Sequence, residues 1–438
     1  MTFRDGLLRA RGHIVFLFAL GVAFATVYAL EKWETVPSIA TQWHPDPNLT
    51  VPQPDRRQLS TDERTAAEVA WTYFAQNLRS ETGLVDSVAG FPASTLWDTG
   101  SFLSAAIAAE RLGIIPRSEF DGIMEKALSS LASLPLYAGT LPNKSFDTRS
   151  LAMTDYTNAP TETGIGWSAL DLGRILIPLH VLALDYPSHA SGVARVLDRW
   201  NIAAAVRDGV IMGAMPTASG YDAVQEGRVG YEQYSARGFA IMGYDVEEAM
   251  RVERFAQIIE VDGISIPVDG RDPEIFGGHS YTLSEPYVLS GLEFGTSLRM
   301  QEMAWRVYQA QENRFQQTGQ LTAVTEDHLD QAPYFVYSSV FANGLPWNVV
   351  TDTGEDARNF RTLSTKAAFG WNALFRTAYT QSLIDAVKPL QSDGGWQAGI
   401  YELTSLPNTV LSANTNAGVL LAMHFIEFGP LLHPEVSP

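Results

Sequence analysis

The distribution of apolar residues from Ser60 onward predicts a chain of helices. The stretch STDERTAAEVAWTYFAQNLR opens with a capping box, Ser60 with Glu63, and then places its apolar residues on one face. The stretch STLWDTGSFLSAAIAAERLG is apolar on nearly all sides and closes with Gly113. The first pattern is typical of a half-exposed helix, and the second is typical of a buried one.

The two kinds of helix alternate to the end of the chain. Helices with one polar face are predicted near residues 61–79, 116–133, 189–200, 244–256, 299–317 and 379–388. Helices that are apolar on most sides are predicted near residues 95–112, 164–185, 231–243, 284–296, 364–376 and 413–427. Six such pairs predict an all-α fold, an (α/α)6 toroid in which buried helices form an inner ring. A helical solenoid is the rival fold, but the sequence has no fixed repeat period with matching residues.

The toroid predicts which side chains are buried in the inner ring. They are Trp97, Phe102, Ile107, Trp167, Ile175, Phe239, Leu289, Trp371 and Val419.

Two regions lack a helical period. Residues 255–269 alternate apolar and polar positions around Asp262 and Gly263, which predicts a small β-hairpin with a two-residue turn. Residues 318–356 are rich in aromatic residues, prolines and polar residues. Loops of this length within a compact domain are usually functional or disordered, and the aromatic content favours an ordered, functional loop.

The N-terminus predicts export across a bacterial inner membrane. Arginines in residues 1–13 precede an uncharged apolar run, 14–30, which predicts a single transmembrane anchor with a cytoplasmic N-terminus and a periplasmic C-terminal domain. A cleavable signal peptide is the alternative, because small residues near the end of this run offer cleavage sites. Residues 31–59 read as a Pro-rich linker, 60–430 as the toroid, and 431–438 as a tail.

Composition excludes several classes of function. The 438-residue chain has 49 acidic against 30 basic residues and a net charge of −19, which argues against binding to nucleic acid. It has no cysteine, and no two of its eight histidines have the spacing of a helical zinc site. Acidic loops lack the spacing of a calcium loop, and no G-x-S-x-G motif occurs. We therefore predict no cofactor and no metal.

Acidic and aromatic residues gather where the predicted inner helices start. Four of the six starts carry a carboxylate, and these are Asp98, Glu162, Glu232 and Glu285. Large aromatic residues accompany them, namely Trp97, Trp167, Tyr231, Tyr234 and Tyr287. Inner helices of a toroid run the same way, so these side chains should crowd one rim. Aromatic faces beside carboxylates suit a sugar, whose ring faces stack and whose hydroxyls donate hydrogen bonds. The alternative is helix capping, which favours an acidic residue at a helix start by about 0.3–1 kcal/mol whatever the function.

Several long motifs resemble one known family. They are GLVDSVAGFPASTLWDTGSF, ETGIGWSALDLGR, GYEQYSARGF, SEPYVLSGLEFG and DGGWQAGIYE, in this order. The chain resembles the bacterial family called domain of unknown function 3131, which is similar to glycoamylase-like toroids. The resemblance implies an α-toroid acting on bacterial polysaccharide, with relatives among enzymes that cleave β-1,2-glucan. In those relatives a carboxylate before an inner helix is followed by a glutamate acid, and Glu162 and Glu232 match that order and spacing.

Glycoside cleavage needs one protonated and one ionised carboxyl group. We assign the acid to Glu232, because its aromatic neighbours should raise the pKa of its carboxyl group. We assign the ionised role to Glu162, held near a helix start, with Asp98 as its rival. Glu285 is expected to bind sugar hydroxyls. The other predicted substrate-binding residues are Asp155, Tyr156, Tyr337, Trp347 and Trp396.

The sequence thus predicts a membrane-tethered periplasmic glycoside hydrolase or transglycosylase acting on a bacterial glucan or exopolysaccharide. The alternative function is a non-catalytic glycan-binding or assembly subunit of a polysaccharide export or envelope complex.

Overall fold

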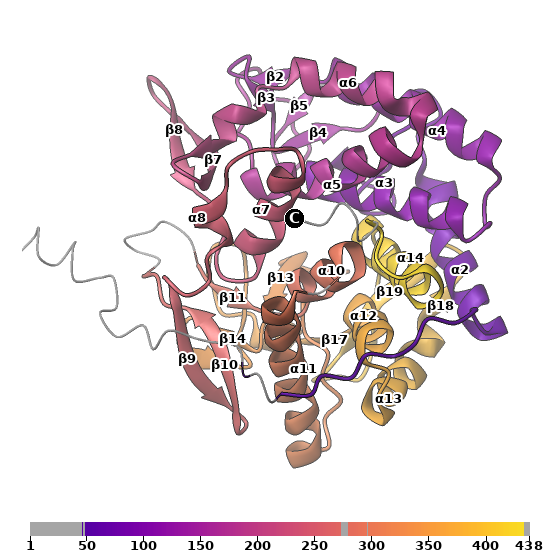
Figure 1. Cartoon of the computed structure of the whole chain (residues 1–438), viewed down its shortest axis with the longest axis vertical. Coiled ribbons are helices and arrows are strands. Elements are labelled where there is room, and N and C mark those ends of the chain that lie inside the picture. Colours follow the sequence, from indigo (N-terminus) through magenta and orange to yellow (C-terminus); the bar gives the residue numbers. More distant parts are fainter. Residues whose placement is uncertain (1–45, 47–48, 273–278, 296, 433–438) are drawn as a thin grey trace, which may run out of the picture.

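Six helices form a closed inner ring (Figure 1). The computed structural model describes residue 46 and residues 49–272, 279–295 and 297–432. The ring helices are α3 (Leu96–Arg111), α5 (Ala169–Asp185), α7 (Tyr231–Ile241), α10 (Glu285–Phe294), α12 (Thr365–Phe375) and α14 (Ala413–Phe428). Each packs on the next, and α14 packs on α3. This closure confirms the predicted toroid.

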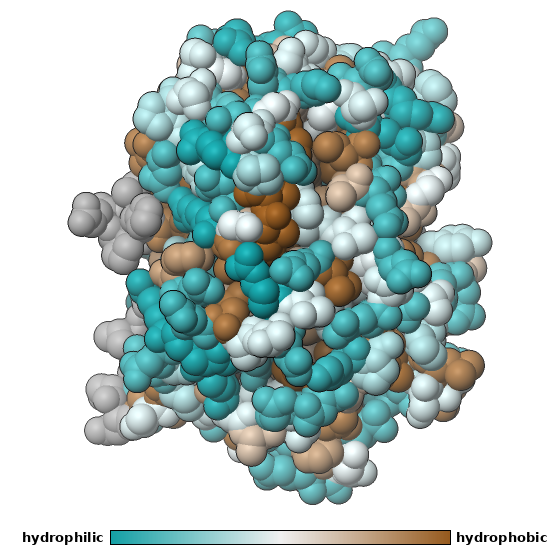
Figure 2. All heavy atoms as spheres, turned by 90° about the vertical axis from the view of Figure 1, so that its right-hand side faces the viewer, coloured by the Kyte–Doolittle hydropathy of each residue, from teal (hydrophilic) through white to brown (hydrophobic). Residues whose placement is uncertain are grey.

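The outer ring consists of amphipathic helices. They are α2 (Thr61–Asn77), α4 (Arg117–Ser133), α6 (Ala190–Arg199), α8 (Glu247–Met250), α11 (Leu298–Thr318) and α13 (Ala378–Val387). Figure 2 shows the side that carries α2 and α4, where hydrophilic side chains predominate around a central group of apolar ones. The fourth outer helix was predicted over 244–256 but covers only the four residues of α8, because the backbone is extended at Arg251 and a strand begins at Ala256.

The barrel interior is mainly apolar, but a buried ion pair joins Arg174 on α5 to Glu293 on α10. All nine side chains expected in the inner ring are buried, the most exposed being Trp97 at 9%. Trp167 precedes α5 rather than lying in it. Burial of large apolar side chains supplies most of the stabilisation of such a fold, at about 1.5–3 kcal/mol for each one.

The prediction of an all-α fold is wrong in one respect, because short antiparallel strands connect the helices. Over the described ranges they make seven small sheets. Before α7 the strands are β1 (Ala93–Ser94), β2 (Leu136–Tyr137), β3 (Leu141–Pro142), β4 (Ser145–Asp147), β5 (Met153–Thr154), β6 (Val206–Arg207), β7 (Val210–Thr217) and β8 (Gly220–Gln225). Most are too short for an alternating pattern to be visible in the sequence.

The predicted hairpin and the predicted ordered loop are both present. The hairpin is β9 (Ala256–Val261) and β10 (Ile264–Asp269), in which Val261 pairs with Ile264 across the turn. Around the loop lie β11 (Tyr281–Thr282), β12 (Glu326–His328), β13 (Phe335–Ser338), β14 (Phe341–Ala342), β15 (Leu345–Pro346) and β16 (Val349–Val350). The last sheet contains β17 (Thr362–Ser364), β18 (Gln391–Ser392), β19 (Gly395–Tyr401) and β20 (Pro407–Leu411).

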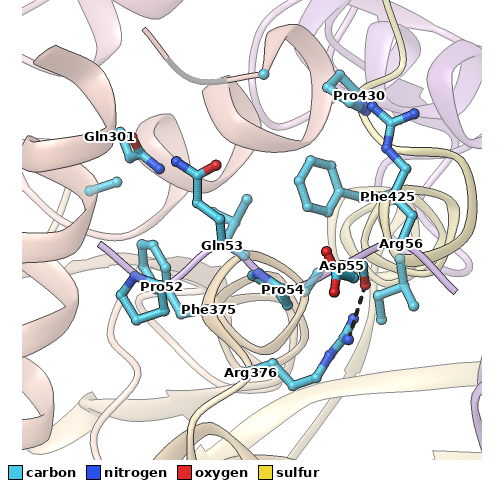
Figure 3. A pocket seen from close by; sticks show the side chains of 15 residues that line it. Pro52, Gln53, Pro54, Asp55, Arg56, Gln301, Phe375, Arg376, Phe425 and Pro430 are labelled. Atoms are coloured by element: carbon cyan, nitrogen blue, oxygen red, sulfur yellow. Dashed lines mark hydrogen bonds between the residues drawn. The ribbon is translucent and has the colours of Figure 1, made fainter. Parts of the chain in front are cut away.

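Residues 49–59, which we call the strap, were predicted to belong to the Pro-rich linker of residues 31–59 but pack on the toroid. This segment lies against the ends of α10, α12 and α14 instead of forming a free tether (Figure 3). The Arg57 amide donates to the Ile426 carbonyl at 3.0 Å, and the Arg376 guanidinium donates to the Asp55 carbonyl at 3.2 Å. A cavity of about 220 Å³ remains between the strap and the helix ends.

The predicted anchor, residues 14–30, lies outside the described residues, as do the tail residues 433–438. Within the described ranges, no helix combines the length and apolar character needed to cross a bilayer.

Candidate active site

Side chains from the starts of three inner helices meet at one end of the barrel. The Trp97 indole on α3 donates to Glu285 Oε1 on α10 at 3.2 Å. The Trp97 ring lies 5.8 Å from the ring of Tyr231, the first residue of α7. The Tyr231 hydroxyl in turn donates to Glu326. The predicted convergence of helix starts is therefore correct for Trp97, Tyr231 and Glu285. We call these three residues, together with Glu326, Lys366 and Asp98, the central cluster.

Glu285 is held by donors from three inner helices. Besides Trp97, the amide of Asn414 on α14 donates to Glu285 Oε1 at 2.7 Å. The ammonium of Lys366 on α12 bonds to Glu285 Oε2. Both partners of this ion pair are buried. Donors of this kind stabilise the ionised form of a carboxyl group.

Glu326 has the opposite character. It lies on β12 within the aromatic loop region and is 8% exposed. Burial raises the pKa of Glu326 to about 8, and the charge of Glu285 acts in the same direction, whereas Lys366 opposes it. Burial therefore favours the protonated form of Glu326, which lies beside Glu285 and its ion pair with Lys366. Glu326 was not predicted from the sequence, because it does not lie at a helix start. Only the alternating pattern of the short strand β12 could have indicated it.

Asp98 is the carboxylate next to this pair. The Ser87 and Thr95 hydroxyls donate to Asp98 Oδ2 at 2.5 and 3.2 Å. Thr95 also caps α3 by accepting from the Asp98 amide at 3.1 Å, which fixes the direction of the aspartate. Within the described part of the chain, Asp98 Oδ1 has no hydrogen bond. This oxygen is available to a substrate or to water.

A second carboxyl pair, Asp171 and Glu226, flanks the central cluster at the start of α5. The Ser168 hydroxyl bonds to Asp171 Oδ1 at 2.9 Å, and the Ala169 amide donates to Glu226. Burial raises the pKa of Asp171 to about 7, and the charges of Glu226 and Asp98 add to the effect. Sequence reasoning missed both residues, although the spacing of Ser168 and Asp171 is the pattern of a helix cap.

Glu162 does not lie at a helix start, which corrects its predicted position. It is exposed in the loop that leads to α5, whose cap is Ser168. Gly164 and Gly166 have φ angles of 78° and 103°, a left-handed conformation that cannot continue into a helix. The carboxylate that occupies this helix start is Glu226. The catalytic role of Glu162 stays a prediction.

Glu232 is in the first turn of α7, as predicted, but its carboxylate belongs to a separate ion cluster. Arg271 donates to Glu232 Oε2 at 2.6 Å, and Gln225 donates to Glu232 Oε1 at 2.9 Å. Arg271 also binds Asp269. Burial raises the pKa of Glu232 to about 6 although the charge of Arg271 lowers it, so the direction of the predicted shift is confirmed. With 2% exposure, Glu232 joins α7 to the strands around it.

Three tyrosines line the approach to the central cluster. Tyr337 is half-buried and stacks on Tyr281, with ring centroids 4.0 Å apart and planes 5° from parallel. Tyr156 is 62% exposed. Burial of its hydroxyl raises the pKa of Tyr156, and the charges of Asp171 and Glu226 contribute. The Tyr156 hydroxyl thus lies near the flanking pair, while much of the side chain is exposed.

Most of the other predicted binding residues have internal hydrogen-bond partners, whereas the buried Tyr287 hydroxyl has none within the described residues. Asp155 accepts the Thr157 and Ala159 amides and so closes an exposed turn. Of the aromatic residues, Trp167 donates to Met212, Tyr234 to Glu293, Trp347 to Asp262 and Trp396 to Ala66, while Tyr287 is buried in α10. These contacts give them a role in the fold, and their contact with a sugar stays a prediction.

Within the described ranges, no three histidine, aspartate or glutamate side chains are grouped so that they could hold a metal ion.

Solved structures share this fold at low sequence identity. A candidate glucoamylase from Bacteroides caccae has a TM-score of 0.63 and 12% identity, over 86% of this chain and 96% of that one. An endo-β-1,2-glucanase from Chitinophaga pinensis, in complex with sophorotriose and glucose, has a TM-score of 0.60 and 11% identity, over 86% and 95%. A cellobiose 2-epimerase from Bacillus thermoamylovorans has a TM-score of 0.51 and 9% identity, over 84% and 99%.

At this identity the likeness shows the fold alone. No curated protein sequence matches the chain. A family model matches residues 65–429, which is nearly the whole toroid, and the chain belongs to that family, described as "Protein of unknown function (DUF3131)".

Proposed function

We propose that the chain is a glycoside hydrolase that cleaves a β-linked glucan at the central cluster. The observation that carries this proposal is the contact series from Glu326 through Tyr231 and Trp97 to Glu285. It places Glu326, whose pKa is raised, and Glu285, which pairs with Lys366, between aromatic rings, and Asp98 lies on the same helix as Trp97. Two carboxyl groups in opposite protonation states are what cleavage of a glycosidic bond requires.

In the proposed reaction, Glu326 gives its proton to the leaving oxygen of the glycosidic bond. Asp98, whose Oδ1 is unoccupied by protein donors, acts in the ionised state on water or on the anomeric carbon. Glu285 has both oxygens bound by protein donors, which suits a fixed charge that orients sugar hydroxyls. The stacked Tyr281 and Tyr337 would support a sugar ring.

The substrate class rests on the fold and on what similar structures bind. The glucanase from Chitinophaga pinensis holds sophorotriose, and one from Talaromyces funiculosus, at 12% identity, holds β-1,2-glucan. A bacterial β-1,2-glucan is therefore the first substrate to test. The proposed place of action is the periplasm, because residues 14–30 read as a membrane anchor or signal peptide.

A non-catalytic glycan-binding subunit of a polysaccharide export or envelope complex is the second candidate. It is favoured by one observation. Glu232, the acid that the sequence predicted, is buried and paired with Arg271, apart from the central cluster. Such a protein would bind the same glucan and leave it intact.

The experiment is an assay of the full chain, extracted in detergent, on purified glucans of defined linkage. Hydrolysis predicts new reducing ends from at least one β-glucan, and Glu326→Gln should abolish them. Asp171→Asn in parallel tests whether Asp171, the other carboxyl group near Asp98 whose pKa is raised, is the proton donor instead. If the chain binds a glucan but produces no new reducing ends, no change in sugar composition and no transfer product, hydrolysis is rejected in favour of binding alone. A product with an epimerised end would instead favour an epimerase.

A further inference from the structure

Lys366 occupies a position that disfavours a cation. It lies in the first turn of α12, where the partial positive charge of the helix start repels an ammonium group. It is also only 7% exposed, and burial of a charge is costly unless the charge is paired. Other inner helices carry acidic residues in this turn, as Asp98 does on α3 and Glu285 on α10. A lysine here needs a compensating role.

The surroundings of Lys366 fix its ammonium group. Its stem packs on α14 at Gly418, where a Cβ atom would lie 2.9 Å from the Lys366 Cβ. The Nζ atom bonds to Glu285 Oε2. The other titratable groups that interact with Lys366 are Glu326, Asp327 and His328, and all three lie on β12.

We propose that Lys366 is a positioning residue: its ammonium group pairs with Glu285 beside Glu326 and so determines that Glu326, rather than Glu285, is the proton donor of these two neighbouring carboxyl groups. This inference rests on the proposed hydrolase function and adds the group that divides the roles of the two carboxyls. Without Lys366, the two carboxyl groups would share one proton as a coupled pair.

Charge and packing make different predictions for three variants. Lys366→Met removes a positive charge near Glu326, so the alkaline limit of kcat/KM should move up by at least about half a pH unit. Glu285→Gln removes a negative charge and should move the same limit down by a similar amount. The double variant removes one positive and one negative charge, so the alkaline limit of kcat/KM should return to within about 0.3 pH unit of the wild-type value. A purely structural role predicts no such reversal of sign.

The test measures pH profiles of kcat/KM for the full chain on a glucan that it cleaves, with thermal unfolding from pH 5 to pH 9 alongside. Lys366→Arg keeps the charge and should keep the wild-type limit, so an equal shift in this variant would overturn the proposal. Active variants whose limits do not move would also overturn it and leave the hydrolase function intact. If Lys366→Met fails to fold, the Glu285→Gln and double variants still decide the outcome. Absence of cleavage by the wild-type chain would overturn both proposals. In that case, opposite shifts of the Lys366→Met and Glu285→Gln unfolding profiles along the pH axis would show only that the two charges are coupled.

Discussion

The two ends of the barrel use hydrogen bonds in different ways. Where the inner helices start, side chains bind one another, as Trp97, Glu285 and Lys366 do. Where they end, many of the bonds join backbone groups, and Arg111 at the end of α3 also pairs with Asp185 at the end of α5. There the Leu431 and Leu432 amides donate to carbonyls of α10, and the strap donates to the end of α14.

This difference follows from the free groups at each helix terminus. Helix starts expose amides, which favour carboxylates, and helix ends expose carbonyls, which any backbone amide can satisfy. The first situation selects ionisable side chains, whose protonation can then be tuned by neighbours. The second is satisfied by chain segments of almost any sequence. We infer that the start end is the chemical end and that the strap end is closed for stability.

The largest expected contrast comes from Glu326 at the chemical end. Glu326→Gln removes the proton donor and should lower turnover by about 10²–10⁴-fold while leaving the unfolding temperature nearly unchanged. The glutamine amide is neutral, like the protonated carboxyl group that the raised pKa of Glu326 favours, so the substitution should disturb the packing little. Turnover on the cleaved glucan and thermal melts measure the two effects.

Glu232→Gln is the matched control within the same end. It weakens the pair with Arg271, so it should lower stability and change turnover much less than Glu326→Gln does. If Glu232→Gln removes activity and Glu326→Gln does not, the acid is Glu232 as the sequence predicted, and the central cluster is a binding site.

The strap end should respond in stability alone. Replacing residues 49–59 with a Gly/Ser segment of equal length, in the full chain, removes the packing of Leu49, Val51 and Leu59 on the core, whereas the backbone bond to Ile426 can still form. We expect a loss of about 2 kcal/mol in the free energy of unfolding. Denaturant unfolding measures this loss, and a drop in kcat/KM below half of the wild-type value in the folded variant would show that the two ends are coupled.

Helical periodicity was enough to predict the toroid, because a helix that is buried on most sides and one with a polar face differ along their whole length. The central cluster was predicted only where it lies on helix starts, as Trp97, Asp98, Tyr231 and Glu285 do. Glu326 reaches the site through a short strand, and Arg271 pairs with Glu232 from beyond the next hairpin. Such contacts depend on tertiary structure and leave no local pattern.

The start of α5 shows the limit of local patterns. Glu162 precedes a glycine pair and looks like a helix-start residue, but those glycines have positive φ angles and delay the helix until Ser168. The carboxylate that meets the helix amides, Glu226, comes from a strand connection far along the chain. A cap can thus be supplied from outside its own segment.

A smaller effect is expected in the pH dependence of stability. Burial raises the pKa of Asp171 to about 7, above its value of about 4 in the unfolded chain. The folded state then holds a proton that the unfolded state releases, so the stability contribution falls as pH rises from about 4 to about 7. Asp171→Asn should flatten this fall by on the order of 1 kcal/mol between pH 5 and pH 7. Melts in buffers of equal ionic strength test it, and parallel profiles for the two proteins would contradict the shifted titration.

Glu162→Gln should have the smallest effect of all. The side chain is exposed, and surface changes of this kind usually alter the free energy of unfolding by less than about 0.5 kcal/mol. It is also separated from the start of α5 by the two glycines, so it neither caps the helix nor belongs to the central cluster. We therefore expect turnover within about twofold of the wild-type value. A loss of about 10²-fold or more would mean that the loop from 161 to 168 closes over the substrate and brings Glu162 to the reaction. In that case the chemical end would include a mobile carboxylate, and the ionised role would pass from Asp98 to Glu162.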